Sequence, residues 1–369
     1  MKILFAIVDG GGNIPPQLAV ARALQARGAE VRVLGHRGVR ERVEATGLAF
    51  EPFTDGKHFD PTVQRSLAAI MTAFARVAAD RRLGQCVAKA ARRHDVDAVV
   101  ADMILAAGIP EIVDSGIPTI VFVHCFYRAV QDLAAGPVGW LLRLRGTDPL
   151  APQHRGLLQV VAARSDLDPM RDDPQVCHTG VVWQGVPSAA EPAPVPRILV
   201  SLSTCAFAGQ RNMLQNILDA VAPLPVEAIV TVGPGIDAAG VRVPKNAAMH
   251  AWLDHDEVLS TASLVVGHGG HSTAMRALSF GVPQVIMPAN PMIDQKGVGA
   301  ALQRVGAAIL LPKHARPKRI RKAIEAVLGD GAYREAAGRL GADIRRRNGA
   351  DVAANAIEEF VRNQQLVDS

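Results

Sequence analysis

The stretch from residue 264 to residue 295 constrains the fold more than any other part of this chain. Residues 264–267 have the pattern of a buried strand end, and His268-Gly269-Gly270-His271-Ser272-Thr273 then breaks the apolar run. Residues 274–280 have helical character, 282–287 form a second apolar run and 288–295 are polar and Pro-rich. A strand, a Gly-rich turn, a helix and another strand make the βαβ unit of a parallel sheet.

The turn itself predicts an anion site. Gly269 and Gly270 let a diphosphate approach the backbone, and the following helix offers unpaired N–H groups and a partial positive charge. Ser272 and Thr273 are expected as N-cap residues of that helix. A Gly-rich turn after a strand is by itself a weak signal, and an ordinary βα turn followed by a polar loop is the competing interpretation.

The residues around the turn make the pattern more specific. His268 to Thr273, then Gly281-Val282-Pro283, Pro288 and Asp294-Gln295 occur in an order that resembles the donor-binding signature of the GT-B glycosyltransferases of family 1. Within that family the pattern looks most like the bacterial enzymes that attach sugars to natural products. The resemblance implies an α/β fold of two doubly wound, Rossmann-like domains that face a central cleft. It also implies that His268, Gly269, Gly270, His271, Ser272 and Thr273 hold the diphosphate of a nucleotide sugar, and that Asp294 and Gln295 hold hydroxyls of its sugar.

The remaining sequence is consistent with two α/β halves. An opening strand, a Gly-rich turn and a helix at residues 2–27 are followed by further strand and helix patterns. Residues 187–196 hold four prolines and predict a semi-rigid linker, after which the α/β pattern restarts. We therefore expect an acceptor-binding domain over 1–186 and a nucleotide-sugar-binding domain over 197–350. A C-terminal helix is expected over 351–369, and one option is that it packs back on the first domain.

Several shorter segments also have recognisable patterns. Residues 62–93 read as mostly helix, and residues 126–157 read as an acceptor-side region of helices and loops. Residues 157–166 also read as helix, and 176–183 lead out of the first domain.

Composition excludes several classes of protein. The net charge of +5 is modest for 369 residues and does not require a nucleic-acid partner. The longest apolar stretch, residues 103–109, is far too short to span a bilayer, so we expect no stable membrane insertion. The four cysteines are isolated, which indicates buried thiols in a reducing compartment. A cytoplasmic protein, monomeric or homodimeric, is the expectation.

Ligands of open parallel sheets bind beyond the carboxyl ends of the strands. Asp9, Asn13, Asp102 and His124 follow strands of the first half, whereas Ser203, Thr204, Gly233 and His268 follow strands of the second. The resemblance further implies that Trp252 and Leu253 pack on the nucleobase, although a core tryptophan is equally compatible with the pattern. Where the family often has a ribose-binding Glu this chain has Arg276, which leaves ribose recognition open, and Arg276 is also a candidate to face the diphosphate.

No metal is expected. Asp254 and Asp256 form a carboxylate pair, but they precede a βα turn and both suit a helix cap. His268 and His271 lie three apart across Gly-Gly, on a turn and not on a ligand-presenting helix. No cofactor is implied, because the nucleotide-diphosphate sugar is a co-substrate.

The sequence leaves several candidates for the group that takes the proton of the acceptor. Asn13 stands where the family usually has His or Asp, and an amide cannot act as a general base. Asp9, His124 or Asp102 could substitute, with Asp102 more an orienting partner. Alternatively a phenol or enol needs only orientation by Asn13, or an activated carbon attacks as in C-glycosylation. An inactive enzyme is the fourth reading.

Together these features predict an inverting, metal-independent glycosyltransferase that uses a dTDP- or UDP-sugar and a small hydrophobic acceptor, aromatic or polyketide-like. Two enzyme alternatives of the same fold are a nucleotide-sugar epimerase and a cell-wall transferase with a lipid acceptor. A third alternative is a non-catalytic auxiliary protein that binds a partner glycosyltransferase.

Overall fold

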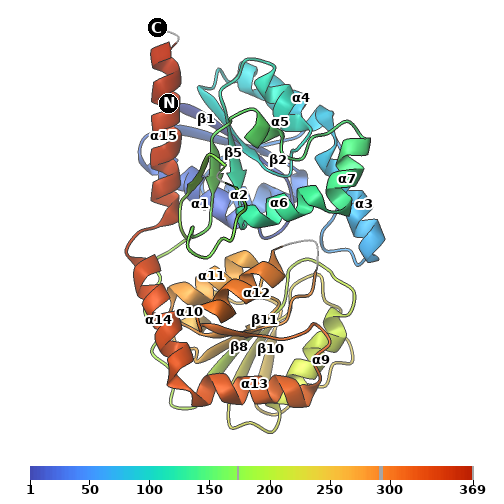
Figure 1. The fold of residues 1–369 in the computed structure, drawn as a ribbon, viewed down its shortest axis with the longest axis vertical. Helices are drawn as coiled ribbons and strands as arrows, with labels where there is room; N and C mark the ends of the chain where they lie inside the picture. Colours follow the sequence, from blue (N-terminus) through green and yellow to red (C-terminus); the bar gives the residue numbers. More distant parts are fainter. Residues whose placement is uncertain (173, 291–293, 368–369) are drawn as a thin grey trace. The chain divides into compact units, whose positions relative to one another are not determined.

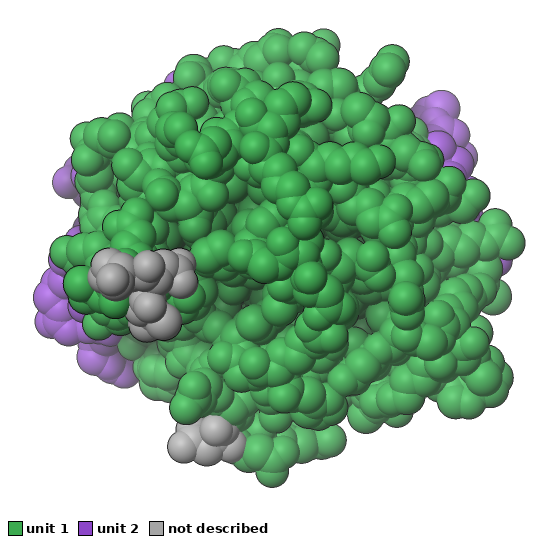
Figure 2. Space-filling model, turned by 90° about the horizontal axis from the view of Figure 1, so that it is seen from above, with its two compact units in different colours: residues 1–60, 68–184, 348–369 green, residues 61–67, 185–347 purple. Residues whose placement is uncertain are grey.

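The computed structural model describes residues 1–172, 174–290 and 294–367, and these form two compact units. Unit 1 comprises Met1–Asp60, Ala68–Gln184 and the C-terminal segment from Asn348, and unit 2 comprises Pro61–Leu67 and Gly185–Arg347. Figure 2 colours the two units separately. No helix in the described part of the chain combines the length and the apolar character needed to cross a membrane.

Unit 1 is built on a seven-stranded sheet with the order β3-β2-β1-β4-β5-β6-β7. Every neighbouring pair in it is parallel. The strands are β1 (Lys2–Ile7), β2 (Glu30–Gly35), β3 (Ala49–Pro52), β4 (Ala98–Asp102), β5 (Thr119–Val123), β6 (Gln159–Val161) and β7 (Val176–His178). The central strands are apolar over most of their length, because helices cover both faces of a parallel sheet. This confirms the first doubly wound half.

The helices of unit 1 follow from local signals. α1 begins at Ile14, and Pro15 and Pro16 fit its first turn, where backbone N–H groups have no partner within the helix. The predicted helix over 62–93 is two helices, and the side chain of Asp80 caps the second by accepting from the amide of Arg82. The helices are α1 (Ile14–Ala26), α2 (Arg40–Glu44), α3 (Leu67–Ala78), α4 (Arg81–Arg93), α5 (Gly108–Val113), α6 (Tyr127–Ala135), α7 (Pro137–Leu144), α8 (Ala151–His154) and α15 (Gly349–Val367), with a 3₁₀ turn η1 (Arg37–Val39).

Helix α15 returns to unit 1 and packs beside α1 (Figure 1). Asn348 pairs with Trp183 through both side-chain amide atoms, and the amide of Gly349 donates to the Val181 carbonyl at 2.9 Å. A Cβ at Gly349 would lie 2.8 Å from that carbonyl oxygen, so the crossing requires glycine. The buried face of α15, with Ile357 fully enclosed, completes the core that α1 and the sheet form.

Unit 2 has a six-stranded parallel sheet with the order β10-β9-β8-β11-β12-β13. Its strands are β8 (Arg197–Ser201), β9 (Glu227–Thr231), β10 (Ala247–His250), β11 (Leu264–Gly267), β12 (Gln284–Ile286) and β13 (Ala308–Leu310). Its helices are α9 (Gln210–Val221), α10 (His255–Leu259), α11 (His271–Ser279), α12 (Gln295–Arg304), α13 (Pro317–Gly329) and α14 (Gly331–Arg345). The second doubly wound half is thereby confirmed as well.

In both sheets the strand order reverses at one point. Numbered within each unit, the strands lie in the order third, second, first, fourth, fifth, sixth, and unit 1 adds its seventh strand at the end. The switch point therefore lies between β1 and β4 in unit 1 and between β8 and β11 in unit 2. Ligands of doubly wound sheets bind beyond the carboxyl ends of the strands at this point. The fold therefore directs attention to the residues that follow β1, β4, β8 and β11.

One predicted element is wrong. Residues 157–166 were expected to be helical, but Gln159–Val161 is the strand β6, which pairs with β5 and β7. Three apolar residues are too few to reveal a period, so a short buried strand cannot be distinguished from a buried helical turn by pattern. The hydrogen-bonded pairing of residues 159–161 with β5 makes this segment a strand.

Candidate functional site

Asn13 lies at the switch point of unit 1. Its Nδ2 donates to the carbonyl of Val8 at 2.7 Å and to Oδ2 of Asp102 at 2.6 Å, and its Oδ1 accepts from the amide of Gly10 at 3.1 Å. The residue is 1% exposed. Both ends of the amide are thus engaged inside the protein, where they tie the turn after β1 to the end of β4.

Asp102 is the centre of this cluster. It is fully buried, its Oδ2 also accepts from Nε2 of Gln17 at 2.8 Å, and its Oδ1 accepts from the amide of Ile104 at 3.0 Å. Several N–H donors around one buried carboxylate compensate its loss of hydration. Gln17 was missed from the sequence, although its position four residues after Asn13 puts both on one helical face.

Asp9 and His36 form a second cluster beside the Asn13 turn. Asp9 is 6% exposed and its Oδ1 accepts from Nη2 of Arg42 at 3.2 Å. The amide of Asp9 donates to Nδ1 of His36 at 3.2 Å, so Nε2 carries the ring proton and donates to the carbonyl of Lys57 at 3.1 Å. Burial, reinforced by the neighbouring His58, lowers the pKa of His36. His36 was also missed, and its signal was its place directly after the strand that ends at Gly35.

His124 follows β5 and is half-buried. β4 separates β5 from β1 in the sheet. Among the four residues considered for the proton transfer, Asn13 and Asp102 are in direct contact, Asp9 lies in the same turn as Asn13, and His124 stands two strands away.

His268 occupies the switch point of unit 2. It follows β11, and its Nδ1 lies 3.4 Å from the carbonyl oxygen of Ser201 at the end of β8, which places the ring proton on Nδ1. Burial lowers the pKa of His268 to about 4, so the ring is neutral near pH 7. Its Nε2 faces Gly270, where a Cβ would lie only 2.5 Å away.

The glycine turn delivers the chain into α11. Gly269 has φ +77°, and a Cβ there would lie 2.5 Å from Cγ2 of Ile286, so only glycine fits. Gly270 is the N-cap, which corrects the expectation that Ser272 and Thr273 cap the helix. Those two residues lie in the first turn, and their amides belong to the unpaired N–H groups of a helix start.

His271 and Asp294 bring the turn and the following loop together. Nδ1 of His271 lies 3.0 Å from Oδ2 of Asp294, and both residues are more than nine-tenths buried. Gln295, the first residue of α12, is fully buried. Residues 291–293 of the predicted loop lie outside the described residues.

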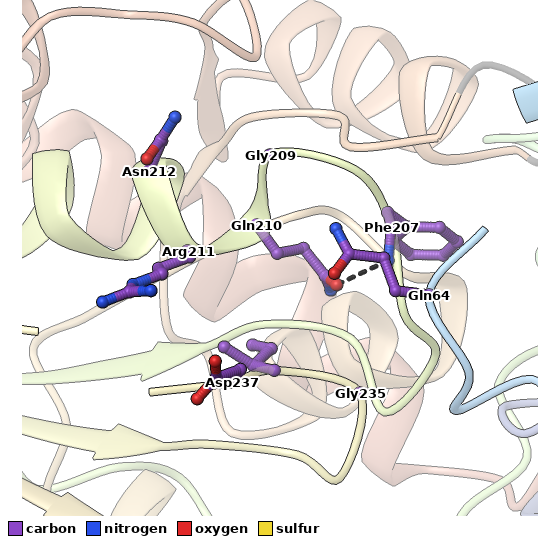
Figure 3. Close-up of a pocket in the computed structure, with 9 residues that line it drawn as sticks. Gln64, Phe207, Gly209, Gln210, Arg211, Asn212, Gly235 and Asp237 are labelled. Atoms are coloured by element: carbon purple, nitrogen blue, oxygen red, sulfur yellow. Dashed lines mark hydrogen bonds between the residues drawn. The ribbon is translucent and has the colours of Figure 1, made fainter. Parts of the chain in front are cut away.

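Ser203, Thr204 and Gly233 line the neighbouring strand ends. The amide of Cys205 donates to Oγ of Ser203 at 3.0 Å, and a Cβ at Gly233 would lie 3.0 Å from Cα of Thr204, so the loops after β8 and β9 touch. Beyond them a cavity of about 250 Å³ opens at the start of α9 (Figure 3). Gln210 at its wall accepts from the amide of Phe207 at 2.6 Å.

Trp252 is 79% exposed, which excludes the core interpretation of this residue. Arg276 does not reach toward the glycine turn, because its guanidinium contacts Oδ1 of Asp256 at 2.5 Å and Oδ1 of Asp254 at 3.5 Å. Asp254 caps α10 through the amide of Asp256. Within the described ranges, no group of three or more His, Cys, Asp or Glu side chains is arranged to hold a metal ion.

Two family models match separate parts of the chain. "Glycosyltransferase family 28 N-terminal domain" matches residues 3–120, and "Erythromycin biosynthesis protein CIII-like, C-terminal domain" matches residues 215–359. The second match contains the whole glycine turn and the His271–Asp294 pair. The chain is a GT-B glycosyltransferase of family 1.

Relatives of this glycosyltransferase include the "Uncharacterized UDP-glucosyltransferase YojK" of Bacillus subtilis, 21% identical over 98% of both chains. The demethyllactenocin mycarosyltransferase of Streptomyces fradiae is 30% identical over 44% of this chain and 35% of its own length. The crystal structure of the calicheamicin glycosyltransferase CalG4 has a TM-score of 0.76 at 23% identity and covers 98% of both chains. The family resemblance drawn from residues 264–295 is confirmed, and it is of the bacterial natural-product type.

Proposed function

We propose that this glycosyltransferase takes a sugar from a dTDP- or UDP-linked donor, inverts its anomeric centre and transfers it to a small natural-product acceptor. The observation that carries the donor half is the start of α11. A glycine turn, a buried neutral histidine and the N-terminal amides of α11 occupy the switch point of unit 2. Oriented N–H groups and the partial charge of a helix start suit a diphosphate.

The remaining donor contacts follow from the same edge of the sheet. Asp294, held by His271, is the carboxylate offered to a sugar hydroxyl, and exposed Trp252 supplies an aromatic face for the nucleobase. The relatives named above are glycosyltransferases, which favours a transferase over an epimerase or an auxiliary protein.

The acceptor half leads to a proposal about the nucleophile. The amide of Asn13 is hydrogen-bonded at both ends inside the protein, so it is not a group that a ligand meets. Asp9 is enclosed beside Arg42. An acceptor whose attacking group is already acidic, a phenol, an enol or an activated aromatic carbon, therefore suits unit 1 better than a plain alcohol.

The donor assignment is tested by titrating the enzyme calorimetrically with dTDP, UDP and GDP. We expect one of them to bind, and His268→Ala to weaken that binding by about 1.5–3 kcal/mol, the range for a hydrogen bond to a charged group. A folded His268→Ala variant with unchanged affinity for every nucleotide would contradict the assignment.

A further inference from the structure

Two side chains from different elements form hydrogen bonds with the backbone of Ala289, in the loop after β12. Its amide donates to Oε1 of Gln295 at 2.7 Å, and its carbonyl accepts from Nζ of Lys313 at 2.8 Å. Oε1 of Gln295 also accepts from the amide of Asn290 at 2.9 Å. Gln295 and Lys313 thus hold this part of the loop through side-chain hydrogen bonds to its backbone.

These bonds fix which end of the Gln295 amide is available. Backbone N–H groups can only donate, so the atom that faces Ala289 and Asn290 must be the oxygen. Nε2 then points the other way, and among the described residues this buried atom has no hydrogen-bond partner. A buried donor without a partner costs about 1–3 kcal/mol, so a ligand that accepts from it is favoured. Gln295 thus presents a donor, not an acceptor.

Lys313 reaches Ala289 from the carboxyl end of the neighbouring strand. It follows β13, which pairs with β12, and its side chain passes Gly209, where a Cβ would lie 3.7 Å from Cε of the lysine. Burial lowers the pKa of Lys313, and one of its three N–H groups is used on the Ala289 carbonyl. The hydrogen bond to the Ala289 carbonyl directs the end of this side chain.

We propose that Lys313 is a positioning residue of the donor site. With Gln295 it clamps the Ala289 peptide from both sides, and the clamp holds Nε2 of Gln295 as a donor for a hydroxyl or ring oxygen of the donor sugar. This rests on the proposed function, since it concerns the sugar end of the same donor. The nucleotide end, at His268 and the start of α11, lies outside the clamp, so the two ends respond differently when the clamp is removed.

The test compares Lys313→Met, which keeps the apolar stem and removes the donor, with Lys313→Arg, which keeps a cation. Lys318→Met, at an exposed lysine of α13 in the same unit, is the matched control. In the ligand-free enzyme, hydrogen exchange of a peptide covering Ala289 and Asn290 should become at least about fivefold faster in Lys313→Met and remain unchanged in Lys318→Met. Lys313→Gln serves if the methionine variant does not fold.

The same variants are then assayed with donor. We expect kcat/KM for the nucleotide sugar to fall about tenfold in Lys313→Met and to recover in part in Lys313→Arg, while the Kd of the free nucleoside diphosphate changes by less than about twofold. Gln295→Glu keeps the acceptor oxygen and loses the donor, so it should reproduce the loss without faster exchange.

Two results would overturn the inference: unchanged exchange in Lys313→Met, or an equal loss for the free diphosphate and for the nucleotide sugar. Wild-type enzyme that binds no nucleoside diphosphate would instead contradict the proposed function. The exchange experiment would still decide whether the clamp exists.

Discussion

The close approach of Gly270 to the His268 ring can be tested by adding a single methyl group. Gly270 has φ −59° and ψ 133°, which any residue adopts, so Gly270→Ala introduces no backbone strain. Its new methyl group would meet Nε2 of His268 and push the ring aside. We expect nucleotide affinity to fall by about tenfold to a hundredfold, as in His268→Ala, measured by calorimetry.

The double variant distinguishes this explanation from damage to α11. If the alanine acts only through the histidine ring, Gly270→Ala should cost little in a His268→Ala background, where the ring is absent. Additive losses would show that Gly270 serves the start of the helix independently of His268.

The lowered pKa of His268 also makes stability depend on pH. The ring takes up its proton near pH 4 in the native protein and near pH 6.5 when unfolded, so the unfolded chain binds more protons between these values. The free energy of unfolding should therefore fall as the pH drops through this window, by up to about 3 kcal/mol. Urea unfolding of wild type and His268→Gln at about pH 7 and pH 4.5 measures it. If the free energy of unfolding fell by the same amount between these pH values in both proteins, the lowered pKa of His268 would not be its cause.

Residues of the candidate site were predictable where the fold alone places them. Asp102 and His268 follow strands of a parallel sheet, and that rule put both at a switch point. Gln17, His36 and Lys313 were missed because their roles depend on partners far away in sequence, such as Asp102 for Gln17. Asn13 is a different case: its motif position predicts a ligand contact, and the structure adds that its amide is hydrogen-bonded to Val8 and Asp102 within the chain.

At the scale of elements, long or strongly apolar segments were predictable and short ones were not. β1 was predicted because a six-residue segment with an apolar run indicates a buried strand. β6, β10 and β13 have three or four residues each, and only pairing with a neighbour makes them strands. α12 was not predicted, because its first residue, Gln295, has the pattern of the polar loop before it.

Helix α15 provides a test of packing between distant segments. Ile357 is fully buried against the core of unit 1, whereas Arg27 of α1 joins α15 through partly exposed pairs with Asp351 and Glu358. Ile357→Ala should lower the free energy of unfolding of unit 1 by about 2–5 kcal/mol. Arg27→Gln should cost less than about 1 kcal/mol, because exposed ion pairs contribute little. Urea unfolding measures both losses. If Arg27→Gln cost as much as Ile357→Ala, the ion pairs would be as important as burial for attaching α15 to unit 1.

At the scale of the whole molecule, the two units use one architecture for different purposes. Both sheets have the same strand order, yet unit 1 fills its switch point with an internal Asn13–Asp102 tie, while unit 2 leaves a glycine turn and a helix start there.

Activity should survive excess EDTA, since helix amides can stabilise the leaving diphosphate without an ion. Loss of turnover that Mg²⁺ or Mn²⁺ restores would implicate Asp254 and Asp256, which Arg276 now occupies.

The internal tie in unit 1 makes the identity of the acceptor the decisive variable for the whole reaction. Removal of a true general base costs about 10²–10⁴-fold in turnover. If the acceptor brings its own acidity, Asp9→Asn and His124→Ala should each stay within about tenfold of wild type with phenols. Asn13→Ala and Asp102→Asn should instead lower stability, because each leaves buried partners of the Asn13–Asp102 bond unsatisfied. The measurement is kcat over a series of acceptors with rising hydroxyl pKa, each variant checked for folding. A steep fall in Asp9→Asn or His124→Ala that appears with every acceptor would identify that side chain as the base. A fall in rate with acceptor pKa that is equally steep in wild type and in both variants would place the acidity in the acceptor.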